Sequence, residues 1–276
     1  MGTQDPLVHI EAATLAGGDN NQDRYAYGDG WAFVLDGATS FSETPPIHDG
    51  GWYAERLKNA LAQHLAAADH TTDTASIVAH SIQDAAADHD AATQGPCPTS
   101  TIALARWRHN VDLYVLGDSF IQYRGINGDS DELADLRIEA AGNDIRTKYK
   151  HRLKEGHGFD ATHQAILKDL QAAQQARRNV HEPLGYWIAG ADPNAAHHAH
   201  TRSLPLGSVQ GLLLCTDGIH DYTRREILRD PSDARMNLME FLVAQHEEEA
   251  NDRDGAKRPR SKIHDDKTAI WICFGA

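Results

Sequence analysis

Apolar and polar residues alternate along the N-terminal part of the chain, through residues 8–16 (VHIEAATLA) and 24–36 (RYAYGDGWAFVLD). A period of two is typical of strands that bury one face, so both segments are expected to form strands. Gly28 and Gly30 interrupt the second segment and predict a hairpin turn there. The chain is therefore expected to begin with β structure.

In the next stretch the apolar residues recur at three- and four-residue spacing. This period predicts two amphipathic helices, over 52–68 (WYAERLKNALAQHLAAA) and 74–90 (TASIVAHSIQDAAADHD). Thr72 or Asp73 is the expected N-cap of the second helix, because a short polar side chain can accept hydrogen bonds from the first free N–H groups.

The rest of the chain mixes apolar runs with polar stretches of helical character. Strands are expected at 100–108 (STIALARWR), 111–119 (VDLYVLGDS), 120–126 (FIQYRGI), 207–219 (GSVQGLLLCTDGI) and 267–274 (KTAIWICF), and helices over about 131–180 and over 234–250. Gly158 and Asp160 predict a break in the first of these helical stretches. The segment 251–262 is expected to be a mobile polar loop. Because strands and helices do not alternate regularly, the order favours an α+β fold over a doubly wound parallel sheet.

The composition is that of an ordinary globular protein, with 276 residues, 41% hydrophobic and 24% charged, and it is sufficient for a full core. A formal net charge of −14 argues against non-specific binding to nucleic acid or to anionic membranes. It favours basic partners or divalent cations, although surplus carboxylates can equally form a solubilising surface.

The cysteines and the hydropathy predict a cytoplasmic protein. Cys97, Cys215 and Cys273 make no disulfide framework, and the last two lie in apolar runs, where a thiol behaves as a small hydrophobe. No apolar stretch approaches the roughly 20 residues needed to span a bilayer, and no signal-peptide pattern opens the chain.

Aspartates recur at the ends of the predicted strands. They are Asp23, Asp36, Asp118, Asp217, Asp265 and Asp266. Taken singly, an Asp-Gly pair after a strand is usually a turn. Carboxylates gathered without Lys or Arg would repel one another, however, and a hard divalent cation is the usual resolution. The shortage of neighbouring Cys and His ligands favours magnesium or manganese over zinc.

The same residues carry a resemblance to a known family. The ordered segments NNQDR, VLDGATS, TSTIALAR, YVLGDS, LLLCTDGIHD and DDKTAIWICF resemble the motifs of the metal-dependent type 2C protein phosphatases, and the set with GYWIA resembles their actinobacterial branch. The resemblance runs from about residue 10 to the C-terminus. It implies one domain over residues 1–276, a four-layer α-β-β-α sandwich of two mostly antiparallel sheets, with 131–183 as a helical, flap-like insert.

The resemblance also implies a binuclear Mn²⁺ or Mg²⁺ centre. Its implied ligands are Asp23, Asp36 (the bridging residue), the carbonyl of Gly37, Asp217 and Asp265, with Asp118 and Asp221 associated with a weaker third ion. Asp36 and Asp23 would be the main catalytic residues, and activated water would attack phosphorus in line. The expected substrate is a phosphoserine or phosphothreonine protein. A binding module with little or no activity, or a hydrolase of a small phosphoester, remain open alternatives.

The sequence departs from better-known type 2C phosphatases near the first motif. They carry a phosphate-clamping Arg where this chain has Gly18, often Glu where it has Gln22, and in many eukaryotic members His where it has Ala38. Arg24 is nearby but should point to the strand face opposite Asp23. The basic stretch 146–163 is either a substrate-guiding flap or a solvated helix face.

Overall fold

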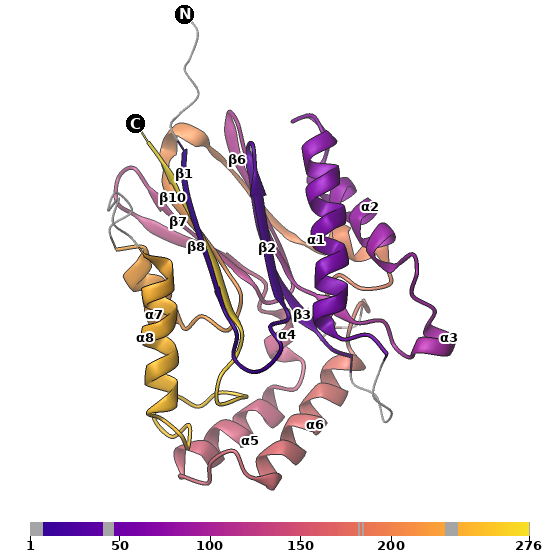
Figure 1. The fold of residues 1–276 in the computed structure, drawn as a ribbon, viewed down its shortest axis with the longest axis vertical. Helices are drawn as coiled ribbons and strands as arrows, with labels where there is room; N and C mark the ends of the chain where they lie inside the picture. Colours follow the sequence, from indigo (N-terminus) through magenta and orange to yellow (C-terminus); the bar gives the residue numbers. More distant parts are fainter. Residues whose placement is uncertain (1–7, 41–46, 182, 184, 230–236, 276) are drawn as a thin grey trace, which may run out of the picture.

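The computed structural model describes residues 8–40, 47–181, 183, 185–229 and 237–275. Two antiparallel sheets pack face to face, and helices cover their outer faces (Figure 1). The sheets have the strand orders β1-β11-β10-β7-β8 and β2-β3-β5-β6-β9, with β4 paired to β3. The predicted α+β sandwich is confirmed. None of the helices in these described ranges is both long and apolar enough to cross a membrane.

Except for β8 and β9, the strands follow the predicted apolar runs closely. Their bounds are β1 Val8–Leu15, β2 Asp23–Gly28, β3 Trp31–Ala38, β4 Thr99–Ser100, β5 Ile102–Trp107, β6 Asn110–Leu116, β7 Phe120–Gly125, β8 Ser130–Ala134, β9 His200–Pro205, β10 Val209–Cys215 and β11 Lys267–Phe274. The expected hairpin joins β2 to β3, and Gly30 has a positive φ of 76°, which glycine adopts without strain.

The helices divide between the two outer faces and one end of the sandwich. Their bounds are α1 Gly50–Ala67, α2 Thr74–Ala86, α3 Ala91–Gln94, α4 Arg137–Ala140, α5 Asn143–Lys154, α6 Ala161–Gln175, α7 Asp221–Ile227 and α8 Leu238–Ala250, with 3-10 turns at Pro193–His198 and Leu206–Ser208. Asp73 caps α2 and Asp160 caps α6 through backbone N–H groups of Ser76 and His163, as the sequence predicted.

Strand β3 shows how the layers are held. Phe33 and Leu35 pack with α1 and α2, whereas Ala32 and Val34 pack between the two sheets. All of these side chains are fully buried. Burying a large apolar side chain stabilises a fold by about 1.5–3 kcal/mol, so a strand apolar on both faces fixes two layers at once.

The expected helix over 131–180 is wrong at its start. Residues 130–134 form the edge strand β8, in which Asp131 pairs with Tyr123 and Glu132 with Gln122 of β7. Only Leu133 of that strand is buried, so its polar composition resembles a helix face. The expected helix at 234–250 begins at Leu238, and residues 234–236 lie outside the described residues.

The segment 251–262 is irregular, as expected, but it is tied to the fold. The buried carboxylate of Asp252 accepts hydrogen bonds from the backbone N–H groups of Lys257 and Arg258, at 3.1 Å each. It also forms an ion pair with Arg260 at 2.8 Å. This segment leads directly into the aspartates that precede β11.

Candidate metal centre

Asp23 and Asp36 face each other across the β2–β3 hairpin. They are register partners, so their side chains lie on the same face of the sheet. Successive side chains of a strand point to opposite faces, so Asp36 lies on the inter-sheet face with Val34, whereas Leu35 lies on the helix-covered face. Two like charges directly opposite each other destabilise a strand pair, which makes this placement costly unless a cation or a proton compensates.

Asp23 is the most enclosed carboxylate of the group, with 3% of its surface exposed. Its Oδ2 accepts a 2.8 Å hydrogen bond from the hydroxyl of Thr216, while its buried Oδ1 has no hydrogen-bond partner among the described residues. Burial raises the pKa of Asp23 to about 7; the hydroxyls of Thr216 and Thr268 oppose the rise, and the charges of Asp266 and Asp217 add to it.

The other sheet brings Asp217 against the pair Asp265–Asp266. β10 and β11 are antiparallel neighbours, so the end of one lies beside the start of the other. A Cβ at Gly218 would lie 1.8 Å from the carbonyl oxygen of Asp266, so only glycine permits this approach. The two segments are therefore in direct backbone contact.

The two adjacent aspartates differ in their roles. Asp266 accepts hydrogen bonds from the backbone N–H groups of Gly17 (2.8 Å) and Gln22 (2.7 Å), and so holds the loop that leads to Asp23. Asp265 instead pairs with the ammonium of Lys262 at 2.7 Å. Asp266 is therefore committed to the backbone of the loop, and the assignment of Asp265 as the ligand stays a prediction.

Asp36, Asp118 and Asp217 complete the acidic group. Burial, followed by the charges of Asp23, Asp217, Asp265 and Asp118, raises the pKa of Asp36 well above its ordinary value. Burial and the charge of Asp217 raise the pKa of Asp118 to about 7. Burial and the charge of Asp265 also raise the pKa of Asp217, but its residue is open to the cavity, so water solvates its charge better than that of Asp23.

A cavity of about 740 Å³ opens over this group. Helices α5 and α6 lie across the ends of both sheets, at the bottom of the view in Figure 1. The charged residues that line the cavity are Asp36, Asp118, Asp217, Asp265, Asp266, Glu139, Arg146, Lys150, Arg178 and Lys262. Helix α5 and the residues after α6 thus contribute cations to a site whose floor is acidic.

The donor set fits hard divalent cations. The carboxylates repel one another, and one buried carboxylate oxygen, Oδ1 of Asp23, has no partner in the described part of the chain. Carboxylate oxygens in such a setting are the ligands that Mg²⁺ and Mn²⁺ prefer. Gly37 lies beside Asp36 in the cavity wall and pairs through its backbone with Ser100.

Other residues singled out in the sequence lie elsewhere or carry other contacts. Asp221, at the start of α7, forms an ion pair with Arg225 at 2.8 Å and is not among the residues that line the cavity. Gly18 lines the cavity with free space around it, and Ala38 is exposed. Arg24 pairs with Glu55 of α1 at 2.7 Å, on the opposite strand face from Asp23, as expected.

A buried ion pair that no sequence pattern indicated lies behind the centre. Lys267 is fully buried, and its ammonium lies 2.8 Å from Glu249 of α8 and 2.8 Å from the carbonyl oxygen of Asp265. Gln245 of α8 donates to the carbonyl of Gly218 at 2.7 Å and to Glu249 at 2.8 Å. Helix α8 therefore holds both loops that carry Asp217 and Asp265.

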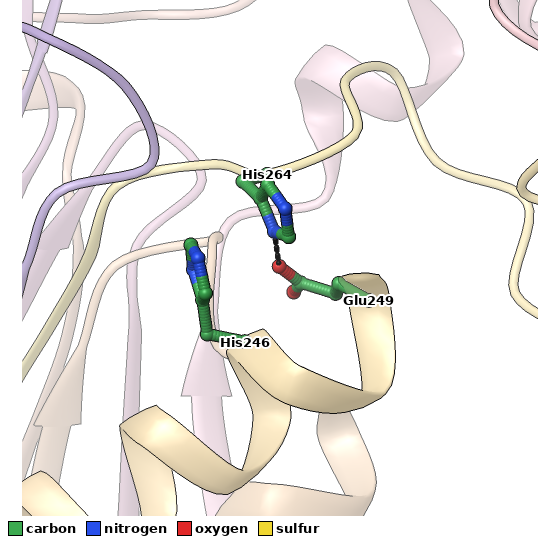
Figure 2. A group of neighbouring side chains, drawn as sticks. All are labelled: His246, Glu249 and His264. Carbon is green, nitrogen blue, oxygen red and sulfur yellow. Dashed lines mark hydrogen bonds and ion pairs between the residues drawn. The ribbon is translucent and has the colours of Figure 1, made fainter. Parts of the chain in front are cut away.

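Figure 2 shows a second group of potential metal ligands beside this pair: His246, Glu249 and His264. The carboxylate of Glu249 is hydrogen bonded to His264 at 2.9 Å and to the ammonium of Lys267. The two imidazole rings stack at 3.8 Å with 16° between their planes, so their in-plane lone pairs do not converge. This arrangement suits a hydrogen-bonded network and not a zinc site.

The comparisons with known proteins identify the architecture. No protein-family model and no curated protein matches the sequence. Among solved structures, the chain resembles the serine/threonine phosphatase PstP/Ppp of Mycobacterium tuberculosis, with a TM-score of 0.57 at 15% identity over 98% of this chain and 99% of that one. The chain has the type 2C phosphatase fold. The resemblance seen in the sequence motifs is confirmed at this level.

Two further structures show the same type 2C fold. Phosphatase Stp1 of Staphylococcus aureus aligns with a TM-score of 0.59 at 12% identity over 100% of both chains. The catalytic domain of PstP has also been solved in complex with two manganese ions, and it matches with a TM-score of 0.57, 15% identity and coverage of 98% and 99%. At these identities the likeness concerns the fold alone.

Proposed function

We propose that the chain is a metal-dependent serine/threonine protein phosphatase with a binuclear manganese or magnesium centre. The observation that carries the proposal is the convergence of carboxylates from both sheets, with the buried Oδ1 of Asp23 lacking a partner among the described residues. A solved protein of the same fold that carries two manganese ions supports this reading.

Asp23, Asp36, Asp217 and Asp265, with the carbonyl of Gly37, are the proposed ligands of two ions. Asp118 lines the same cavity and is proposed for a third ion, while the assignment of Asp221 stays a prediction because the structure pairs it with Arg225. Bound Mn²⁺ or Mg²⁺ supplies Lewis-acid activation of water and neutralises charge on phosphoryl oxygens.

The protein's own residues position and shield this chemistry. Asp266 fixes the loop at residues 17–22, and the Gly218 contact fixes Asp217 relative to Asp265. The insert narrows the approach from solvent by covering the sheet ends. Ala38 offers no imidazole to protonate a leaving group, so water is the proposed proton source for the leaving alkoxide.

The proposed substrate is a protein carrying phosphoserine or phosphothreonine. The test is hydrolysis of p-nitrophenyl phosphate and of a phosphothreonine peptide, with and without Mn²⁺, by the wild type and by Asp36→Asn and Asp217→Asn. We expect both variants to lose about 100-fold or more in activity, because loss of even an outer partner of a metal ligand costs about 10- to 100-fold.

Asp29→Asn is the matched control, since Asp29 is exposed in the turn of the same hairpin that carries Asp36. Turnover that does not depend on added metal, or full activity in both Asn variants, would refute the binuclear proposal. Tight Mn²⁺ binding without turnover of any phosphopeptide would favour a phosphatase-fold binding module instead.

A further inference from the structure

The cavity must attract an anion although its floor is acidic. This inference rests on the proposed function, in which a phosphorylated group enters the site. Two cations bound to the carboxylates would offset their charge, but the outward oxygens of a phosphate still need donors from the cavity wall. The lining contains four cationic side chains: Arg146, Lys150, Arg178 and Lys262.

Three of these cations are poorly suited to hold phosphate at the centre. Lys262 is already paired with Asp265 at 2.7 Å. Arg178 also keeps free donors, but its 3.0 Å hydrogen bond to the hydroxyl of Ser40 ties it to the segment after β3. Lys150 is exposed and carries a compact charge without a bidentate fork.

Arg146 differs from them in its position. It is half-buried on α5, and it lines the cavity together with Asp118 and Asp217. Helix α5 lies across the ends of both sheets, where these two carboxylates belong to the cavity wall. Gly18, which lines the same cavity, has free space and no side chain to offer.

The guanidinium of Arg146 also has donors to spare. It donates to the carbonyl oxygen of Glu139 at 3.2 Å and also contacts the Tyr149 hydroxyl, and no described carboxylate lies within ion-pair distance. Arg152, further along the same helix, is by contrast paired with Asp160 at 2.8 Å. A guanidinium carries five N–H donors, so Arg146 retains enough for a bidentate phosphate contact.

We propose that Arg146, presented by α5 of the helical insert, is the side chain that binds the substrate phosphate in this cavity. The competing role is charge compensation, in which Arg146 only neutralises Asp118 and Asp217. The two roles make opposite predictions. A phosphate-binding arginine controls affinity for phosphate and the KM, whereas a compensating arginine controls the affinity for metal ions.

The test uses the full chain loaded with Mn²⁺ and compares Arg146→Gln, Arg146→Lys and the wild type. Calorimetric titration with inorganic phosphate gives the Kd, and p-nitrophenyl phosphate kinetics give the KM and kcat. We expect Arg146→Gln to weaken phosphate binding and to raise the KM by about 10-fold or more, since charge-assisted hydrogen bonds are lost. Arg146→Lys should retain only part of the wild-type phosphate affinity, because lysine cannot form the bidentate contact.

Lys148→Gln removes one charge from an exposed position on the same helix and serves as the control, expected to match the wild type. A separate Mn²⁺ titration distinguishes the two roles. The inference is overturned in favour of charge compensation if Arg146→Gln keeps the wild-type phosphate affinity and KM but binds Mn²⁺ more tightly.

The inference and the proposed function can fail separately. A wild type that hydrolyses phosphoesters while Arg146→Gln behaves identically refutes the role of Arg146 alone. A wild type that neither binds Mn²⁺ nor hydrolyses phosphoesters refutes the proposed function. In that case phosphate is titrated into the metal-free proteins, and the absence of any binding that depends on Arg146 overturns the inference as well.

Discussion

Replacing Lys267 with methionine should destabilise the fold strongly, although the new side chain is apolar and of similar length. Lys267 is fully buried and Glu249 is 2% exposed, with 2.8 Å between ammonium and carboxylate. Burial opposes ionisation of Glu249, but hydrogen bonds from Lys267, Gln245 and His264 hold its pKa below the ordinary value. The Glu249 carboxylate is therefore favoured in its ionised form in the folded protein.

The size of the expected loss in unfolding free energy follows from leaving the buried Glu249 carboxylate without its counter-ion. Removing one partner of a buried ion pair costs about 3–5 kcal/mol, because the other charge remains desolvated. Domains have a total stability of about 5–15 kcal/mol, so this loss is a large share. At roughly 2–4 °C per kcal/mol for a chain of this size, the Tm should fall by about 6–20 °C.

The assay is thermal and urea unfolding of the metal-free protein, followed by circular dichroism, for Lys267→Met, Glu249→Gln and the double variant. The double variant should be clearly more stable than the sum of the two single effects predicts, because it removes the uncompensated charge. Lys148→Met, at an exposed position, is the control and should change stability by no more than about 0.5 kcal/mol. A loss below about 1 kcal/mol in Lys267→Met, or strict additivity, would refute this reasoning.

Three other predictions concern the acidic centre. In EDTA the Tm of the protein should fall as the pH is raised from about 4 to about 7. The pKa of Asp23 is raised to about 7 in the folded state, so over this range the folded protein holds a proton that the unfolded chain has released. A Tm that does not change with pH would contradict this. Gly218→Ala should cost about 1–3 kcal/mol in urea unfolding, since its Cβ would lie 1.8 Å from the carbonyl of Asp266. Lys262→Met should tighten Mn²⁺ binding by at most about 5-fold in calorimetry, because it frees Asp265 from an exposed ion pair; weaker binding would argue against Asp265 as a ligand.

The strands and the candidate ligands could be predicted because their signals are local. Apolar runs such as residues 209–215 are followed by a polar turn, and the Asp-Gly pair at 217–218 marks the strand end within a few letters. The convergence of these strand ends follows from pairing of antiparallel neighbours. The helix start at 131–134 was predicted wrongly because the local signal is weak there. An edge strand needs few buried residues, and in β8 only Leu133 is buried.

The contacts behind and above the centre could not be predicted because they join distant parts of the chain. Nothing near Lys267 in the sequence indicates that its ammonium meets Glu249, and the basic stretch on α5 is compatible with an exposed helix face until the fold places Arg146 over the cavity. Long-range polar pairs have no period and no motif, so only the tertiary structure reveals them.

The acidic centre also links metal binding to folding stability. Asp23 and Asp36 are cross-strand partners with like charge, an arrangement that destabilises the hairpin whenever both are ionised. The fold tolerates it because the same hairpin buries Phe33 and Leu35 on one face and Val34 on the other. A cation that binds only the folded state should therefore raise stability by about 2.7 kcal/mol at 100 times its Kd. At a fixed cation concentration this gain should grow as pH rises through 7, because the cation then no longer competes with protons for Asp23 and its Kd falls.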